Sequence, residues 1–598
     1  SGIQIDATGY AGIGVDNNVP GFLSEIDKAN SHGTIGFDSD VSESIDTFSS
    51  AVDLTGFNST IRLGSATAAI LSGTIMPQGT DYRFGGGGGN LFVASMLTDQ
   101  SSPAVRNIVA ESPSEAPLTV HLENTANTVS GTVQAKDSAI IFGDGVPLPG
   151  TGRNFTMNAG GYIGNAHNPS GSVTELSLSS FLGHFATTTP GIIGFDLTST
   201  STSTRSVDLT GVDLTGFTGG VYLGTASALR DTSGGITGAG VQFTGTIGAD
   251  SIGVNRVHRF AAYKTGALDI AGTLTGTSLI IGNPDSRGAF GDQQRQERSV
   301  VLISGNNAGK LASGVTLYGG ELIVGQATGD GTIGTTATNA LGSGTISVMP
   351  VNFTFDDDED DEAPEPALTV SSDNIIINNP IALSTDLIVG DSRNFTLGGI
   401  ISGNGEISIG VEEDSSVKVT FAGNNTFTGG IDINNSNTAT FTHDNATGKG
   451  GLGFDGQSGG TANFETANPV VYGLESHGSS ATLNLNYSGN RIFTINQAED
   501  SRFKGNISGS GASTIVKEGV GTLLFDSGTI TSSGISDGQG NDVSLEIKNG
   551  TFFFGQNANL SSGTVKVNGG TLAVQGGKTL SNTVKVSSGR VAGFAFES

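Results

Sequence analysis

The residues best suited to chemistry form one acidic run, DDDEDDE, which APEP follows directly. Its members are Asp356, Asp357, Asp358, Glu359, Asp360, Asp361 and Glu362. Clustered carboxylate oxygens are the ligands that Ca²⁺ prefers, but an organised site spaces them around a tight turn, as in D-x-D-x-D-G, and that spacing is absent. Adjacent carboxylates repel one another and stay solvated. The run therefore predicts a solvated linker over residues 356–366, with weak or bridging binding of a divalent cation as the alternative.

Histidine and cysteine give no second metal chemistry. The histidines are scattered, without an H-x-x-x-H spacing or a close pair, so the sequence does not predict zinc. They are His32, His121, His167, His184, His258, His443 and His477. The chain has no cysteine, which excludes thiolate ligands and disulfides. We therefore expect no resident cofactor apart from the Ca²⁺ alternative.

Two further patterns could suggest catalysis or nucleotide binding. The glycines Gly85 to Gly89 lack the G-x-x-x-x-G-K-[ST] arrangement, so they predict a tight corner or close backbone packing. Enzymes on β-helices act chiefly on polysaccharides and need carboxylates that converge from neighbouring turns of the chain. At a period of roughly 20 residues, as in stacked repeats, such a register aligns Asp526 with Glu546 and little else. We interpret these two as solvated acids and predict a chain that is not an enzyme.

The composition indicates which secondary structure would position any functional site. The chain has 598 residues, of which 94 are glycine, 35% are hydrophobic and only 14% are charged. Val, Ile, Leu, Phe and Thr recur in short runs from end to end, which favours an ordered all-β protein with many turns over a disordered chain. The segment FLSEIDKAN (Phe22 to Asn30) is the best helix candidate.

The C-terminal part repeats itself with a period of roughly 20 residues, which lies within the range of solenoid repeats. NGTFFF begins at Asn549, GGTLAV at Gly569 and SGRVAGF at Ser588, and TVKV occurs at Thr564 and again at Thr583. Short β-favouring runs at such a period, separated by Gly, Asn and Ser, are typical of stacked repeats. The predicted fold is an all-β parallel β-helix or β-solenoid with Gly/Asn-rich turns and loop excursions.

A longer repeat occupies the first half. VDLTGFNSTIRLG begins at Val52 and VDLTGFTGGVYLG at Val212, while TIGFDSD begins at Thr34 and IIGFDLT at Ile192. The repeats predict the following organisation: a β-solenoid module over 1–180, a related module over 181–300, a β-strand repeat segment over 301–355, the acidic linker over 356–366 and C-terminal repeats over 367–598.

Two blocks match a known pattern. FAGNNTFTGGIDI (Phe421 to Ile433) and VNGGTLAV (Val567 to Val574) fit a hydrophobic strand, then G-x-N-x-(Y/F)-x-G-G, a short strand and N-x-G-T-L. In this the chain resembles the autotransporter-associated β-strand repeats of large bacterial surface proteins. The resemblance implies a parallel β-helical passenger outside a bacterium that has an outer membrane. It also implies a C-terminal membrane barrel, for which we expect no room, and we expect SGIQIDATGY to be a processed mature end.

Charge and hydropathy exclude two classes of partner. The net charge is −29, and no basic stripe is present to meet phosphates, so we expect no nucleic-acid binding. No apolar run approaches the length of roughly 18 residues that a membrane-spanning helix needs, so we expect no transmembrane helix.

Repetition without a chemical constellation favours a structural role. We predict a non-catalytic extracellular fibre, filament or sheath subunit on the cell surface that associates with itself. The N-terminal segment (Ser1 to Asp16) and the C-terminal segment (Thr583 to Phe596) would make the end-to-end contacts. An adhesin passenger that binds a host, prey or glycan surface is the second reading, and a β-helical polysaccharide-active enzyme is the third.

Overall fold

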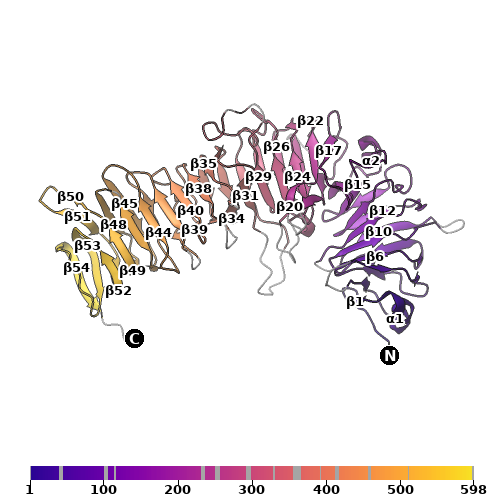
Figure 1. Cartoon of the computed structure of the whole chain (residues 1–598), viewed down its shortest axis with the longest axis horizontal. Coiled ribbons are helices and arrows are strands. Elements are labelled where there is room, and N and C mark those ends of the chain that lie inside the picture. Colours follow the sequence, from indigo (N-terminus) through magenta and orange to yellow (C-terminus); the bar gives the residue numbers. More distant parts are fainter. Residues whose placement is uncertain are drawn as a thin grey trace. The chain divides into compact units, whose positions relative to one another are not determined.

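A computed structural model describes most of the chain. The described residues are 2–39, 45–99, 105–113, 116–230, 236–249, 256–290, 298–327, 330, 332–353, 365–390, 392–410, 416–455, 459–509 and 511–594. The chain divides into two compact units. The first contains residues 1–305, 318–321 and 351–364, and the second contains 306–317, 322–350 and 365–598 (Figure 1).

The first unit is built from short strands in three main sheets and a few isolated pairs. The first sheet has the order β1 (Tyr10–Ile13), β2 (Thr34–Phe37), β5 (Arg62–Gly64), β8 (Asp81–Phe84), β10 (Asn107–Glu111), β12 (Val133–Lys136) and β14 (Phe155–Met157). The second includes, in order, β3 (Asp46–Phe48), β6 (Ala68–Leu71), β9 (Asn90–Val93), β11 (Thr119–Leu122), β13 (Ala139–Phe142), β15 (Tyr162–His167), β16 (Ile192–Leu197), β18 (Tyr222–Thr225), β23 (Val257–Ala262) and β26 (Ser278–Ile281). The third includes β17 (Arg205–Asp208), β21 (Val241–Thr244), β24 (Ala267–Ile270) and β27 (Val300–Ile303). The isolated pairs are β4 (Val52–Asp53) with β7 (Ile75–Met76), β19 (Ala228–Arg230) with β20 (Ile236–Ala239), and β22 (Thr246–Ile247) with β25 (Thr273–Leu274).

The second unit repeats this construction with longer strands towards its C-terminal end. One series contains β28 (Gly314–Leu317), β30 (Ile346–Val348), β33 (Ile381–Leu383) and β36 (Ile401–Gly403), and another contains β29 (Glu321–Val324), β31 (Ala367–Val370), β34 (Leu387–Val389), β37 (Glu406–Ile409), β39 (Gly430–Ile433) and β41 (Leu452–Gly453). The largest sheet comprises β32 (Ile375–Ile377), β35 (Phe395–Leu397), β38 (Lys418–Phe421), β40 (Thr438–Phe441), β42 (Thr461–Phe464), β43 (Val470–Val471), β44 (Thr482–Leu485), β45 (Arg491–Asn496), β46 (Ser501–Phe503), β47 (Asn506–Gly509), β48 (Ser513–Glu518), β49 (Thr522–Thr531), β50 (Ile535–Ser536), β51 (Asp542–Ile547), β52 (Thr551–Leu560), β53 (Thr564–Gln575) and β54 (Val584–Phe594).

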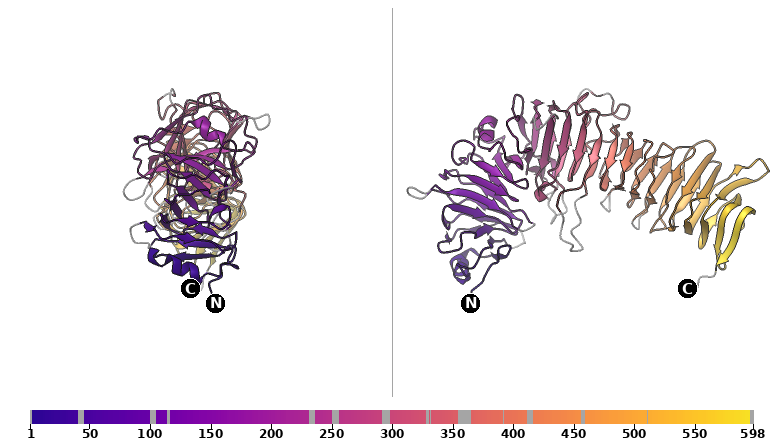
Figure 2. Two further views of the ribbon diagram at one scale, coloured as in Figure 1. Left: turned by 90° about the vertical axis from the view of Figure 1, so that its right-hand side faces the viewer. Right: turned by 180° about the vertical axis from the view of Figure 1, so that it is seen from behind.

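Helices are short and lie outside the sheets. Among the described residues they are η1 (Asp16–Asn18), α1 (Val19–Glu25), α2 (Leu178–Gly183) and η2 (Arg287–Phe290). The predicted helix over 22–30 is shifted towards the N-terminus, because α1 begins at Val19 with a proline in its first turn and ends at Glu25. Within each unit the strands lie side by side in successive layers (Figure 2). The prediction of an all-β chain with parallel sheets is confirmed, and this architecture is compatible with a β-solenoid.

Parallel pairing aligns the C-terminal repeats in register. Thr551 of β52 lies opposite Thr571 of β53, which lies opposite Arg590 of β54. In the other part of these strands Val565 pairs with Val584. The period predicted from the C-terminal repeats therefore equals the number of residues that separates two register partners on neighbouring strands.

Stacked identical side chains fill the interior of the second unit. The rings of Phe421 and Phe441 lie 5.5 Å apart, and those of Phe441 and Phe464 lie 4.8 Å apart. All three are buried. Amides stack in the same way, since the Nδ2 of Asn484 donates to the Oδ1 of Asn463 at 3.0 Å.

The first copy of the longer repeat places a tyrosine over the glycine of the next strand. Tyr10 donates a hydrogen bond to Asp38 at 2.6 Å, and Asp38 accepts a second one from the N–H of Ala66 at 2.7 Å. A Cβ atom on Gly36 would lie only 2.0 Å from Oη of Tyr10. Glycine is required at position 36 because the ring of Tyr10 occupies the space that a larger side chain would need there.

The second copy repeats this arrangement in a buried setting. Tyr162 donates to Asp196 at 2.8 Å, and Asp196 accepts from the N–H of Ala226 at 2.7 Å. A Cβ atom on Gly194 would lie 1.9 Å from Oη of Tyr162. The sequence repeat is thus also a structural repeat, although the module boundaries predicted from it remain a prediction.

Substituting Gly194 by alanine tests this contact. Gly194→Ala inserts a methyl group into a fully buried ring, so we expect a loss of about 1–3 kcal/mol and a lower midpoint of thermal unfolding. Gly216→Ala is the control, because no atom lies within 4 Å of its added Cβ. Equal midpoints for the two variants, measured by circular dichroism, would contradict the proposed steric role.

Candidate functional site

The first unit contains an open pocket of about 290 Å³ where turns between strands meet a returning loop. Ser112 follows β10, Asp137 lies between β12 and β13, and Gly160 lies between β14 and β15. The loop after β26 contributes Asp285, Arg287 and Gly288, and the other lining residues are Pro113, Pro117 and Phe353. The pocket is called the loop pocket below.

Long-range hydrogen bonds hold the returning loop in place. Asn283 donates through Nδ2 to the carbonyl of Ala159 at 2.6 Å, and Ser286 donates through Oγ to the carbonyl of Gly160 at 3.2 Å. These partners are separated by 124 and 126 residues. The loop is therefore anchored at both sides of Asp285 by polar contacts to the backbone.

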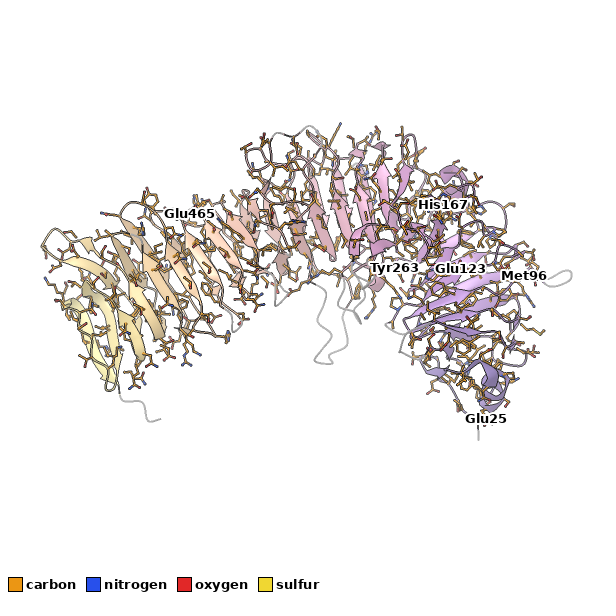
Figure 3. The ribbon with its side chains drawn as sticks, viewed as in Figure 1. Glu25, Met96, Glu123, His167, Tyr263 and Glu465 are labelled. Carbon is orange, nitrogen blue, oxygen red and sulfur yellow. The ribbon has the colours of Figure 1, made fainter. Side chains whose placement is uncertain are left out.

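A buried tyrosine lies beneath the loop pocket. Tyr263, which is labelled in Figure 3, is fully buried. Its ring lies 4.8 Å from that of Tyr162. Its hydroxyl has no hydrogen-bond partner among the described residues. A Cβ atom on the lining residue Gly288 would lie 2.8 Å from that hydroxyl. Burial raises the pKa of Tyr263, and the negative charge of Asp137 in the pocket wall raises it further.

The rim of the loop pocket combines opposite charges with an aromatic ring. The guanidinium of Arg287 lies over the ring of Phe353, 5.1 Å from its centroid. Asp285 accepts a hydrogen bond from the Nδ2 of Asn352 at 2.8 Å. On the opposite wall Asp137 accepts from the Nδ2 of Asn158 at 2.8 Å.

A second pocket, of about 220 Å³, lies beside α2 in the same unit. Its arginine, Arg205, is 3% exposed and forms an ion pair with Glu175 at 2.7 Å. Arg205 also donates to the carbonyl of Asp196 at 3.0 Å and lies over the ring of Phe195. The guanidinium of Arg205 is therefore engaged within the protein, which indicates a structural role for this arginine.

The second unit carries a row of carboxylates along neighbouring strands. Glu406 belongs to β37 and Asp432 to β39, while Asp386, Asp455 and Glu475 lie close enough to act on them electrostatically. This set is called the carboxylate row. Glu406 and Asp432 are offset and not aligned, because Glu406 lies opposite Gly430, while Asp432 lies opposite Ser408 and Gly453.

Asp432 is the member of the carboxylate row whose charge is most strongly affected. Burial, then the negative charges of Asp455 and Glu406, raise its pKa to about 7. The Oδ1 of Asp455 lies 2.6 Å from the Nδ1 of His477. Asp432 can therefore take up a proton near neutral pH.

The acidic run Asp356 to Glu362 lies outside the described residues, so its predicted linker role and cation binding remain predictions. Among the residues that the structure describes, no group of three or more His, Cys, Asp or Glu side chains could hold a metal ion.

Two of the scattered histidines make contacts within the protein. His121 stacks on Phe92 at 4.4 Å, and burial lowers its pKa to about 4, while His258 accepts a hydrogen bond from the N–H of Gly276.

The glycine run forms the predicted corner. Gly85 to Gly89 connect β8 to β9, and Gly86 to Gly88 have φ between 79° and 89°. A Cβ atom on Gly89 would lie 1.9 Å from the carbonyl oxygen of Thr67. Both the tight turn and the close backbone packing are confirmed.

The alignment of Asp526 with Glu546 is wrong. Glu546 lies opposite Val516 and Lys566, and its carboxylate pairs with Lys566 at 3.0 Å. Asp526 instead pairs with Arg502. The local period is longer than in the repeats that follow, because β50 and the turn after it are inserted between β49 and β51.

Comparisons with protein-family models, with curated proteins and with solved structures give no match to this chain. Among the described helices, none has the length and apolar character needed to cross a membrane.

Removing the acid from Asp432 should change how the stability of the second unit depends on pH. Between about pH 4 and pH 7 the folded state keeps a proton on Asp432 that the unfolded state has lost, so stability falls as pH rises through this window. Above pH 7 the ionised acid is unfavourable, and Asp432→Asn should stabilise the protein by about 1–2 kcal/mol once solvent screening is allowed for.

The control for Asp432→Asn is Asp526→Asn, which breaks a surface ion pair with Arg502 and should cost less than about 1 kcal/mol. Urea unfolding at pH 5 and pH 8 measures both variants. A destabilising effect of Asp432→Asn at pH 8 would contradict the assignment.

Proposed function

We propose that this chain is a non-catalytic structural protein: a β-solenoid that serves as a fibre, filament or sheath subunit on the surface of a bacterium with an outer membrane. The observation that carries the proposal is the parallel, in-register pairing of successive strands through each unit. Stacked turns of this kind bury a continuous core and leave their ends as edges for pairing. The bacterial and extracellular parts of the proposal rest on the resemblance to autotransporter-associated repeats.

Two edge strands support self-association. In the described residues β1 is the first strand of its sheet and β54 the last strand of another. On β54, Val586 is 53% exposed and Val591 is 51% exposed, although the aligned residues Val567 and Leu572 of β53 are fully buried. The same apolar pattern that packs inside β53 is thus presented to solvent by β54, where a second copy would cover it.

An adhesin that binds a glycan or cell surface is the second proposal, and the loop pocket favours it. A polysaccharide-active enzyme remains the third. Its support in the sequence is the alignment of Asp526 with Glu546, which the structure contradicts.

Electron microscopy of the purified full chain tests the structural role. In negative stain we expect regular filaments or sheets. The double variant Val586→Lys and Val591→Lys should abolish them, because two charges would enter the apolar contact. Val520→Lys is the control, since Val520 is 72% exposed in the turn after β48 and should leave the assemblies unchanged.

Isolated particles at every concentration, or filaments that persist in the double variant, would refute this mode of assembly. The same grids with a chelator test the acidic run. Disassembly would indicate that a divalent cation bridges subunits, and unchanged filaments would leave the run as a linker.

A further inference from the structure

We propose that the loop pocket of the first unit binds one or two residues of a neutral saccharide. The proposal does not depend on self-association, because every lining residue belongs to one unit of one chain. It rests on the size of the cavity, the balance of its charges, its apolar wall and one buried hydroxyl without a partner.

The size and the openness of the pocket suit a small polar ligand. The volume of about 290 Å³ lies at the lower end of the range for small-molecule sites. The pocket is open, so one end of an oligosaccharide can enter while the remainder stays in solvent.

The charges favour a neutral ligand over an ionic one. Asp137 and Asp285 present carboxylates from two sides, and Arg287 presents a guanidinium between the loop and Phe353. An anion would be attracted by the arginine but repelled by two carboxylates, and a cation would be attracted by the carboxylates but repelled by the arginine. For either ion, repulsion would offset part of the attraction. Sugar hydroxyls can donate to both carboxylates and accept from the guanidinium at the same time.

The apolar wall supplies the second half of saccharide recognition. The half-buried ring of Phe353 and the prolines Pro113 and Pro117 line the pocket. The C–H face of a sugar ring can pack against such surfaces, as apolar walls with a few fixed polar groups do in small-molecule sites. The stacked guanidinium of Arg287 helps to fix the orientation of the Phe353 ring.

The hydroxyl of Tyr263 is the independent sign of a ligand. A buried hydroxyl without a partner is unfavourable, and buried polar groups in proteins are almost always hydrogen-bonded. Tyr263 is fully buried, has no partner among the described residues and lies directly beneath Gly288 of the pocket lining. A ligand hydroxyl that reaches past Gly288 would satisfy it.

Saturation-transfer NMR of the full chain tests the proposal. The probes are neutral gluco-, galacto- and manno-oligosaccharides, with a galacturonate trisaccharide and a glucosamine trisaccharide as charged comparisons. We expect transfer to at least one neutral probe at millimolar concentration and weaker transfer to both charged ones. Phe353→Ala and Asp285→Asn should each weaken binding by about tenfold.

The matched controls lie outside the pocket. Tyr487→Ala removes an aromatic side chain that is 40% exposed in the second unit, and Asp213→Asn changes an exposed turn acid of the first unit. Both should bind as the parent chain does. Asp285→Asn keeps the proposal falsifiable if Phe353→Ala perturbs the loop, because Asp285 is exposed and the exchange preserves its shape.

A third variant separates a ligand contact from a structural defect. Tyr263→Phe should raise the unfolding midpoint, since it removes an unsatisfied buried group, and should weaken saccharide binding at the same time. Three outcomes would overturn the proposal: no transfer to any neutral probe, stronger binding of a charged probe, or affinity unchanged in both Phe353→Ala and Asp285→Asn.

Discussion

Parallel backbone pairing between neighbouring strands is the constraint on which the rest of this structure depends. It places each side chain about 4.8 Å from the side chain at the same position of the next strand. Residues at one position of successive strands therefore form a column, and the side chains of a column must pack favourably against one another. Apolar columns gain from this, as the stacked rings of Phe421, Phe441 and Phe464 show. Amide columns also gain, because each amide carries both a donor and an acceptor, as Asn463 and Asn484 do.

Charged columns respond in the opposite way. Like charges on neighbouring strands raise one another's energy even when they are offset. Burial and then the negative charges of Asp455 and Glu406 raise the pKa of Asp432 to about 7, although Glu406 and Asp432 do not lie opposite one another. Where the chain alternates signs the same geometry is favourable, since Glu546 lies opposite Lys566 and pairs with it at 3.0 Å. The low content of charged residues follows from the same constraint, because few columns can carry charge without such alternation.

Periodicity explains which features could be predicted from the sequence. The alignment of Thr551 with Thr571 follows from their spacing alone, because the last strands follow one another at a nearly constant distance along the chain. The alignment of Asp526 with Glu546 failed for the same physical reason: an inserted hairpin lengthens the local period without leaving a mark at either residue. The aspartates of the Tyr–Asp contacts lie in repeats that can be recognised in the sequence. The sequence alone, however, does not show that the ring of Tyr162 lies over Gly194 of the next strand.

The loop pocket lay beyond such reasoning because its parts share no period. Asp137 and Asp285 are far apart in the sequence, and they meet only because the loop that contains Asn283 and Ser286 folds back onto earlier turns. A column of repeated residues offers a ligand the same chemistry at every level, which suits a long polymer or a second copy of the chain. A mixed set of carboxylate, guanidinium, aromatic ring and phenol requires segments that leave the column. In a chain built by repetition, selective recognition of a small ligand is therefore to be sought in the loops that interrupt the repeat, and the loop pocket is formed by one of them.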